Sequence, residues 1–318
     1  MNRSVCAVIV TYNRKTYLAT LLESLLKQTY PLSAILIVDN HSSDGTDTML
    51  TELGIVDSVE EDTIKEKNTT SIRWLYYRSS ENSGGSGGFN NGLRLATEME
   101  YDYIWAMDDD VCPADNCLEN LVKHMSMDSQ ICVPNRNCLK FNDNAVTAFN
   151  LSSPFGAMVA SSIPGNEIEQ ETVRVVGMAF EGPLIDTCLV KKIGLPNKDL
   201  FIFFDDTDYA MRASKETNIL YCRDAILNKQ IIPTVSSFTM MNWRDYYMFR
   251  NMIWFYRKYA TNVLTRKLKP IFIIARPFVG AIVKRKWANL KVLYKAYADG
   301  IGNKLGKTVE PGTPGSAF

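Results

Sequence analysis

The chain has 318 residues, 46% of them hydrophobic, and its 35 lysines and arginines balance 35 aspartates and glutamates. Such a chain can bury a sizeable core, in one large domain or in one domain with an appendage, which excludes a disordered protein. The zero net charge hides an asymmetry. Residues 1–256 carry 22 basic against 33 acidic side chains, whereas residues 257–307 carry 13 basic side chains and the single acid Asp299. The basic part therefore needs a partner of its own.

The cysteines and the apolar stretches bear on the cellular compartment. Seven cysteines without a C-x-x-C pair or a secretory signal fit a reducing cytosol. Four of them lie between residues 112 and 138, at spacings looser than those of common zinc sites. The best candidate for a membrane span, residues 270–283, is too short and is interrupted by Arg276 and Pro277. We expect a cytoplasmic protein without a membrane-spanning segment.

The first fifty residues alternate between strand and helix patterns. Residues 5–10 form a continuous apolar, β-branched run that predicts a buried strand, and leucines at helical spacing follow until Pro31. A second strand is expected over residues 35–38, and turn-forming residues lead from it into a helix over residues 47–53. This order predicts a right-handed parallel βαβ unit.

A glycine-rich segment follows the next predicted strand, over residues 72–77, after a polar insertion expected at residues 55–70. Four glycines between residues 84 and 88 let the backbone approach a ligand closely, and a helix expected from about Leu93 offers free amides to a phosphate. The dinucleotide fingerprint is excluded because Asn90 stands where its third glycine is needed. A merely flexible turn is the alternative.

Two apolar runs end in acids. The first ends in Asp108, Asp109 and Asp110, where an open α/β sheet places its ligand, and adjacent carboxylates suit Mg²⁺ or Mn²⁺ bridging substrate phosphates. The second, residues 200–204, ends in Asp205 and Asp206, and apolar surroundings raise a carboxyl pKa as a general base requires. A solvated acidic turn and an acidic helix start are the alternatives.

The C-terminal quarter combines aromatic, basic and apolar residues. Residues 243–257 predict a helix in which Arg244, Arg250 and Arg257 can bind phosphate bidentately. Residues 264–307 predict basic amphipathic helices, which lie on anionic membrane surfaces. Nucleic acid is the competing partner, but no nucleic-acid-binding motif accompanies the charge, so we expect none to bind. A strand is also expected at residues 173–180 in the less regular middle of the chain.

In combination, four segments resemble the family-two inverting glycosyltransferases of GT-A fold: residues 8–14, 37–46, 82–89 and 107–110. The glycine pattern and Asp205-Asp206 are most similar to the branch of galactofuranosyl- and rhamnosyltransferases of bacterial cell-surface polysaccharides. The resemblance implies an α/β fold with a Rossmann-like, mixed, mainly parallel sheet flanked by helices and a C-terminal helical appendage. Residues 1–240 would form the catalytic, nucleotide-sugar-binding domain, and residues 241–318 a helical region that contacts the acceptor and the membrane surface.

The resemblance also assigns individual roles. Donor binding would fall on Thr11, Tyr12, Arg14, Asp39, Gly84, Gly85, Gly88, Asp108 and Asp109. The metal, Mn²⁺ or Mg²⁺, would be held by Asp108 and Asp110. Catalysis would fall on Asp206 as the base and on Asp205, which orients the acceptor, while Trp243 and Arg250 would face the acceptor. Relatives often carry a histidine metal ligand near residues 225–230. Here either Asn228 fills that position or Lys229 supplies part of the metal's charge.

The implied reaction moves a sugar from a UDP- or dTDP-linked donor to a polyprenyl-diphosphate-linked glycan, for a capsule, O-antigen or cell-wall polysaccharide. Galactofuranose is the first choice of sugar and rhamnose the second. The protein would act on the inner face of the cell membrane as a peripheral protein, and whether it forms a homo-oligomer is open. A nucleotidyltransferase-type metal enzyme and a non-catalytic scaffold of a polysaccharide assembly complex are the other classes left open.

Overall fold

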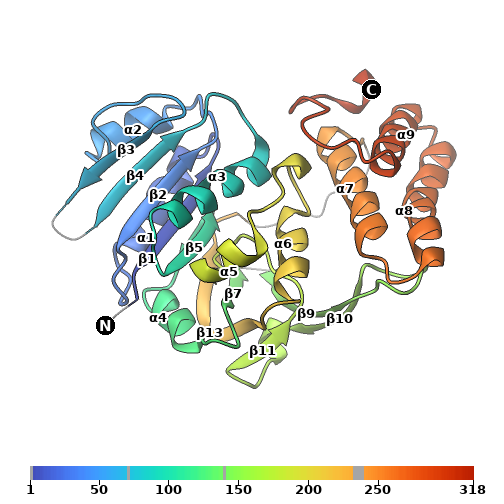
Figure 1. Cartoon of the computed structure of the whole chain (residues 1–318). Coiled ribbons are helices and arrows are strands. Elements are labelled where there is room, and N and C mark those ends of the chain that lie inside the picture. The colour runs from blue at the N-terminus through green and yellow to red at the C-terminus, as the bar shows by residue number, and fades with distance from the viewer. Residues whose placement is uncertain (1–2, 70–71, 139–140, 232–239) are drawn as a thin grey trace.

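The fold is a central mixed sheet flanked by helices, with a group of three helices at the side away from β3 and β4 (Figure 1). The computed structural model describes residues 3–69, 72–138, 141–231 and 240–318. Over these residues the strand order of the main sheet is β11-β13-β7-β12-β5-β1-β2-β4-β3, with β6 beside β13 and β8 beside β7.

The N-terminal half of the sheet is parallel. Its strands lie in the spatial order β5 (Tyr103–Asp108), β1 (Val5–Thr11), β2 (Ala34–Asp39) and β4 (Arg73–Arg78). Every residue of β1 and β2 is buried, as the continuous apolar runs predict for strands covered on both faces. With α1 (Lys15–Leu25) and α2 (Thr46–Glu52) these strands confirm the expected βαβ unit. The carboxyl ends of all four strands therefore meet at one edge.

The other half makes the sheet mixed. Its strands are β6 (Val111–Pro113), β7 (Ile131–Cys138), β8 (Phe141–Asn142), β11 (Thr172–Val175), β12 (Leu184–Asp186) and β13 (Ile219–Lys229). β12 is antiparallel to both β5 and β7, whereas β7 and β13 are parallel. A separate antiparallel pair consists of β9 (Asn144–Phe149) and β10 (Val159–Pro164). Helices α4 (Cys117–His124), α5 (Thr187–Ile193) and α6 (Asp205–Ala213) complete this half.

Three C-terminal helices pack on one another: α7 (Trp243–Tyr259), α8 (Val263–Val283) and α9 (Trp287–Ile301). A capping box between Asn242 and Asp245 fixes the start of α7. Phe201 belongs to the same apolar cluster as α7 and α9, so these helices are joined to the segment before α6. The expected boundary near residue 240 adjoins residues 232–239, which lie outside the described residues, and the division into two domains stays a prediction. Among the described residues no helix is both long and apolar enough to span a membrane.

Three elements differ from the sequence-based expectation. The glycines do not form a loop: α3 (Gly84–Glu98) is helical from Gly84 onward, because packing against β1 and the segment before α6 outweighs the low helix propensity of glycine. The polar insertion contains the edge strand β3 (Ile64–Asn68), paired with β4. The strand expected at residues 173–180 is only β11, Thr172–Val175.

Candidate active site

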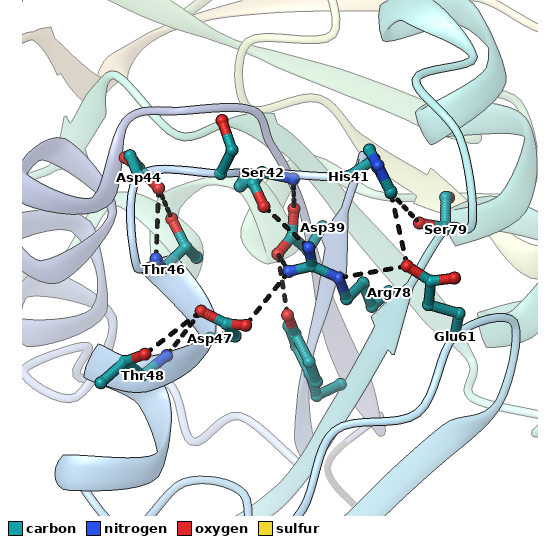
Figure 2. Close-up of polar contacts among 12 residues, drawn as sticks. Asp39, His41, Ser42, Asp44, Thr46, Asp47, Thr48, Glu61, Arg78 and Ser79 are labelled. Atoms are coloured by element: carbon teal, nitrogen blue, oxygen red, sulfur yellow. Dashed lines mark hydrogen bonds and ion pairs between the residues drawn. The ribbon is translucent and has the colours of Figure 1, made fainter.

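Asp39, at the end of β2, is the centre of a closed polar network (Figure 2). Its side chain is completely buried, and its two oxygens accept from the Ser42 amide at 2.7 Å, the Tyr76 hydroxyl at 2.8 Å and Arg78 at 3.3 Å. Arg78 also donates to the Ser42 carbonyl oxygen at 2.8 Å. Asp39 was expected to bind the donor. Its contacts fix the loop after β2, and its binding of the donor stays a prediction.

A second network links the ends of β1 and β5. Asp109 is 2% exposed and accepts from the Thr11 hydroxyl at 2.8 Å, the Tyr12 amide at 3.3 Å and Arg14 at 3.1 Å. The same Arg14 nitrogen reaches Asp110 at 2.8 Å. Thr11 and Asp109 thus contact each other, and their direct contact with the donor stays a prediction. The Tyr12 side chain is exposed, and Arg14 is the cation nearest the acids.

The acids at the end of β5 repel one another, as their adjacency predicts. Burial, followed by the charges of Asp110, Glu181 and Asp109, raises the pKa of Asp108 well above its ordinary value. Burial also raises the pKa of Asp109 to about 6, against the opposing effects of Arg14 and Thr11. A divalent cation between Asp108 and Asp110 would relieve this repulsion, so the chemistry of the two carboxylates fits a metal that also binds phosphate oxygens. In the described part of the chain, no cluster of three or more His, Cys, Asp or Glu side chains forms a metal cage.

Lys229 is one of the two residues considered for the position near residues 225–230 where the resemblance implies a histidine. The end of β13 pairs with β6, so that Lys229 is opposite Val111, and the Gln230 amide donates to the Asp110 carbonyl oxygen at 2.8 Å. The Lys229 ammonium forms an ion pair with Glu181 at 2.5 Å, whereas Asn228, one residue earlier on the strand, is exposed. Of Asn228 and Lys229, Lys229 is the residue whose side chain contacts Glu181. The charge of Glu181 in turn acts on Asp108.

The glycines of α3 serve the packing of the protein itself. A Cβ at Gly84, where φ is +71°, would lie 2.1 Å from the Phe201 carbonyl oxygen, and one at Gly88 would lie 2.4 Å from a Val10 methyl group. Gly84 and Gly88 are needed for contact with the segment before α6 and with β1, and their expected role in the approach of the donor stays a prediction. A Cβ at Gly85 would meet nothing within 4 Å, so Gly85 alone of these three has open space beside it.

The second pair of acids follows a strained segment. Phe201, Phe203 and Phe204 all have positive φ, between 64° and 70°, a conformation that non-glycine residues rarely adopt and that clusters at functional sites. Asp205 and Asp206 then begin α6. Burial, with the charge of Asp206 second, raises the pKa of Asp205 to about 7. Burial also raises the pKa of Asp206, against hydrogen bonds from Thr207.

One oxygen of Asp206 is held and the other is available. Its Oδ1 accepts from the Thr207 amide at 2.5 Å and from the Thr207 hydroxyl at 3.1 Å, while Oδ2 has no protein partner among the described residues. Asp206, Phe203 and Phe204 line a cavity of about 350 Å³ whose other walls include β9 and Arg136. A carboxylate with a raised pKa and a free oxygen at a cavity wall can accept a proton from a bound hydroxyl group.

Arg250 corrects an expectation. Its side chain is fully buried, and its guanidinium donates to the carbonyl oxygens of Leu200 at 2.9 Å and Gly306 at 2.7 Å, so it cannot face an acceptor. The neighbouring Asn251 donates to the carbonyl oxygens of Leu200, Ile202 and Phe203. Both side chains hold the strained segment in place. Trp243 is half-buried at the first turn of α7, against Tyr247.

Arg244 is an exposed arginine of α7 beside the strained segment. Its guanidinium lies over the rings of Phe203 and Trp243 at 5.4 and 5.7 Å, and its side chain has no hydrogen bond or ion pair within the described residues. Burial and the positive charge of Arg14 lower its pKa. A cation in the first turn of a helix opposes the helix dipole, so this position is favourable only if an anion binds there.

Glu181 acts electrostatically on the acids at the end of β5 and on those at the start of α6. The sequence did not identify it as a site residue. Its negative charge raises the pKa of both Asp108 and Asp206, so both carboxylates lie within electrostatic range of it. Burial would raise the pKa of Glu181, but its ion pairs with Arg136 and Lys229 lower it below the ordinary value. The sequence signal is weak: Glu181 directly follows the strand expected at residues 173–180, but a single acid before Gly182-Pro183 predicts only a turn.

Comparisons with known proteins agree with this geometry. Residues 6–148 match the model of Glycosyl transferase family 2. The chain is 25% identical over 211 residues to galactofuranosyltransferase GlfT1 of Mycolicibacterium smegmatis, covering 65% of this chain and 64% of the relative. It is 29% identical over 213 residues to GlfT1 of Mycobacterium tuberculosis, covering 67% of this chain and 65% of the relative. The chain thus matches slightly less than two thirds of the length of these relatives.

Solved structures share the fold at low identity. TarS of S. aureus in complex with UDP-GlcNAc has a TM-score of 0.56 at 14% identity, covering 94% of this chain and 81% of that chain. The mannosyltransferase PcManGT of Pyrobaculum calidifontis, in complex with GDP-Man and Mn²⁺, has a TM-score of 0.54 at 14% identity, covering 96% and 88%. The chain has the GT-A fold of these glycosyltransferases, and its first half is similar to Glycosyl transferase family 2. By sequence, the chain is also similar to the galactofuranosyltransferases GlfT1.

Proposed function

We propose that the protein transfers a sugar, with galactofuranose favoured over rhamnose, from a nucleoside diphosphate donor to a lipid-linked glycan with inversion at the anomeric carbon. The observation that supports this most is that Asp108 and Asp206, nearly a hundred residues apart, both lie within range of Glu181. In this proposal Asp108 lies on the donor side of a single site and Asp206 on its acceptor side. The galactofuranosyltransferase relatives support the choice of sugar.

Asp206 acts as the base in this proposal. Its free Oδ2 takes the proton of an acceptor hydroxyl group held in the cavity of about 350 Å³, and the hydroxyl oxygen attacks the anomeric carbon from the face opposite the nucleoside diphosphate. Arg14 and Arg244 supply positive charge for the phosphates of the donor. Asp205, 7% exposed, lies beside the base and orients the acceptor in this proposal.

Asp108 and Asp110 would hold Mn²⁺ or Mg²⁺ together with phosphate oxygens of the donor. The cation, when bound, neutralises charge that develops on the departing diphosphate. The solved mannosyltransferase neighbour was crystallised with Mn²⁺ and GDP-Man, which is consistent with such a cation. Lys229 contributes a fixed positive charge beside Glu181, so we expect the requirement for the cation to be partial.

The basic C-terminal helices support our proposal for the acceptor and the place of action. Residues 257–307 carry 13 basic side chains, and α8 exposes apolar residues, so this part of the protein suits the surface of an anionic membrane. We propose peripheral binding to the inner face of the cell membrane, where a polyprenyl-diphosphate-linked glycan is available.

The test is transfer in vitro from UDP-galactofuranose, with dTDP-rhamnose in parallel, to a synthetic prenyl-diphosphate glycan. General-base catalysis contributes roughly two to four orders of magnitude, so Asp206→Asn should lower turnover by that factor while donor binding is retained. Near-normal turnover of this variant would show that Asp206 is not the base. Binding of the donor without transfer or hydrolysis in the wild type would favour a scaffold.

A further inference from the structure

Helix α8 presents an apolar stripe on the side away from the other C-terminal helices. Six of its apolar residues are between 43% and 76% exposed: Leu264, Ile271, Phe272, Val279, Ile282 and Val283. At about 3.6 residues per turn they fall within about a third of the helix circumference. The buried residues Pro270, Ile274 and Ala281 lie on the opposite side, and Ile274 belongs to the same apolar cluster as α7 and α9. The stripe is therefore an outer surface of the molecule.

The charge around the stripe is of one sign. Helix α8 contains no acidic residue. By the same helical spacing Lys267 falls just beyond one edge of the stripe and Arg276 just beyond the other, and both side chains are exposed. Apolar residues bordered by cations favour the surface of an anionic membrane. A second copy of this chain is disfavoured as the partner, because it would bring the same cations against these.

The loop between β9 and β10, residues 150–158, extends the stripe toward the sheet. The ring of Phe155 is 60% exposed, and its centroid lies 4.7 Å from that of Phe272. The buried Lys269 ammonium donates to the Gly156 carbonyl oxygen at 2.8 Å, and the Asn150 amide donates to the Phe155 carbonyl oxygen at 2.7 Å. Figure 1 shows this loop reaching from β9 and β10 to α8. The loop is thus fixed on the helix that carries the stripe.

The far end of the same loop forms a wall of the cavity that contains Asp206. Met158 and Val159 line that cavity. They follow Phe155 by three and four residues, and three residues span at most about 11 Å. Val159 is 38% exposed, and Met158 shares an apolar cluster with Ile273 of α8. An apolar path therefore leads from the stripe to the cavity.

We propose that the stripe of α8 and Phe155 lie in the apolar layer of an anionic bilayer, and that the lipid-linked acceptor passes from this bilayer along Met158 and Val159 to Asp206. The inference rests on the proposed function, since it assigns the side from which the acceptor of that reaction enters. Because the path from Phe155 to the cavity wall is short, the lipid chain stays in the bilayer while the sugar reaches the carboxylate.

Vesicle flotation of the full chain tests the surface. The protein should bind phosphatidylcholine vesicles that contain phosphatidylglycerol, bind pure phosphatidylcholine vesicles more weakly, and bind less at high salt. Val279→Asp/Val283→Asp should lower the partition coefficient at least about tenfold, because two apolar side chains are lost from the hydrocarbon. The matched control, Leu53→Asp/Met127→Asp, adds the same charges at exposed apolar positions outside the C-terminal helices and should bind as the wild type does.

Transfer to two acceptors tests the route. One is the glycan on a long prenyl diphosphate embedded in vesicles, and the other is the same glycan on a short water-soluble carrier. Phe155→Asp should lower the ratio of the embedded to the soluble rate at least about tenfold, because a charge on the apolar path is costly. Leu53→Asp/Met127→Asp should leave this ratio unchanged.

The outcomes are distinct. Equal vesicle binding by the two double variants would overturn the docking surface. So would a wild-type dimer in sedimentation without vesicles that Val279→Asp/Val283→Asp converts to a monomer, which would assign the stripe to a second copy. An unchanged ratio in Phe155→Asp would overturn the route. Binding to vesicles through the stripe without transfer to either acceptor would refute the proposed function and leave the surface standing, whereas transfer to the soluble acceptor without vesicle binding would do the reverse.

Discussion

The side-chain amide of Asn251 lies 3.0 Å from the carbonyl oxygen of Phe203, two residues before Asp205. The same amide nitrogen donates to two further carbonyl oxygens of this segment, so a buried residue of α7 fixes the backbone that carries the proposed base. Phe203 has positive φ, and such a conformation persists only where the surrounding structure imposes it. Asn251 is therefore a positioning residue.

Replacement of Asn251 by alanine should affect turnover more than donor binding. Leaving buried carbonyl oxygens without a donor costs about 1–3 kcal/mol in the free energy of unfolding, and release of the strained segment should displace Asp206. We expect kcat to fall at least about tenfold, with KM for the donor nearly unchanged, because small misplacement of a catalytic group is costly. Asn120→Ala is the control, since the Asn120 amide also donates to a backbone carbonyl oxygen, that of Asp224, but lies on α4. If Asn251→Ala and Asn120→Ala lowered kcat equally, Asn251 would not be a positioning residue.

The rate of transfer should fall on the acid side at a pH well above that of an ordinary carboxyl group. A base must be ionised, and burial raises the pKa of Asp206 and, to about 7, that of its neighbour Asp205. Lowering the pH protonates Asp205 and Asp206, so the ionised base is lost. Measurement of kcat at saturating donor between about pH 5 and 9 checks this. An acid limb with its midpoint near 4 would contradict it.

Asp205→Asn should stabilise the protein at high pH. The folded-state pKa of Asp205, about 7, lies above its ordinary value of 3.8, so ionisation disfavours the folded state. This penalty is absent below about pH 4 and complete above about pH 7, where it corresponds to at most about 4 kcal/mol. The increase in Tm on substitution should therefore be larger at pH 8 than at pH 4.5.

The control for this substitution is Asp208→Asn. Asp208 is also buried but forms ion pairs with Lys258 at 2.6 Å and Arg212 at 3.1 Å. Removing its charge takes the carboxylate away from two cations, so Tm should decrease at pH 8. The contrary outcome is that Asp205→Asn lowers Tm at pH 8, as Asp208→Asn does. The ionised carboxylate of Asp205 would then stabilise the folded state, and its pKa would not be raised.

Arg244→Gln should weaken the preference for a diphosphate over a monophosphate. Arg244 is exposed beside Phe203 and near Arg14, and hydrogen bonds to a charged group contribute about 1.5–3 kcal/mol, which is about tenfold or more in affinity. The ratio of Kd values for UMP and UDP should therefore decrease by that factor. Arg257→Gln, at the far end of α7, should leave the ratio unchanged. The same ratio in both variants would exclude Arg244 from the phosphate site.

The sequence by itself determined the parallel strands, the helix of α7 and the two groups of acids at the ends of a strand and of an apolar segment. Continuous apolar runs and helical spacing are local properties, and carboxylates after a buried strand must lie at the sheet edge. The resemblance to a known family added the role expected of each residue in binding the donor, the metal and the acceptor.

Only the tertiary structure decided which polar side chains are accessible. Arg244 and Arg250 are six residues apart on one helix, yet Arg250 is buried under the segment before α6 and Arg244 is exposed beside it. Gly84 and Gly88 are used in packing, and Glu181 joins two distant acids, because the partners in these contacts come from remote parts of the chain. Burial and charge proximity depend on how those parts pack, which no local pattern encodes.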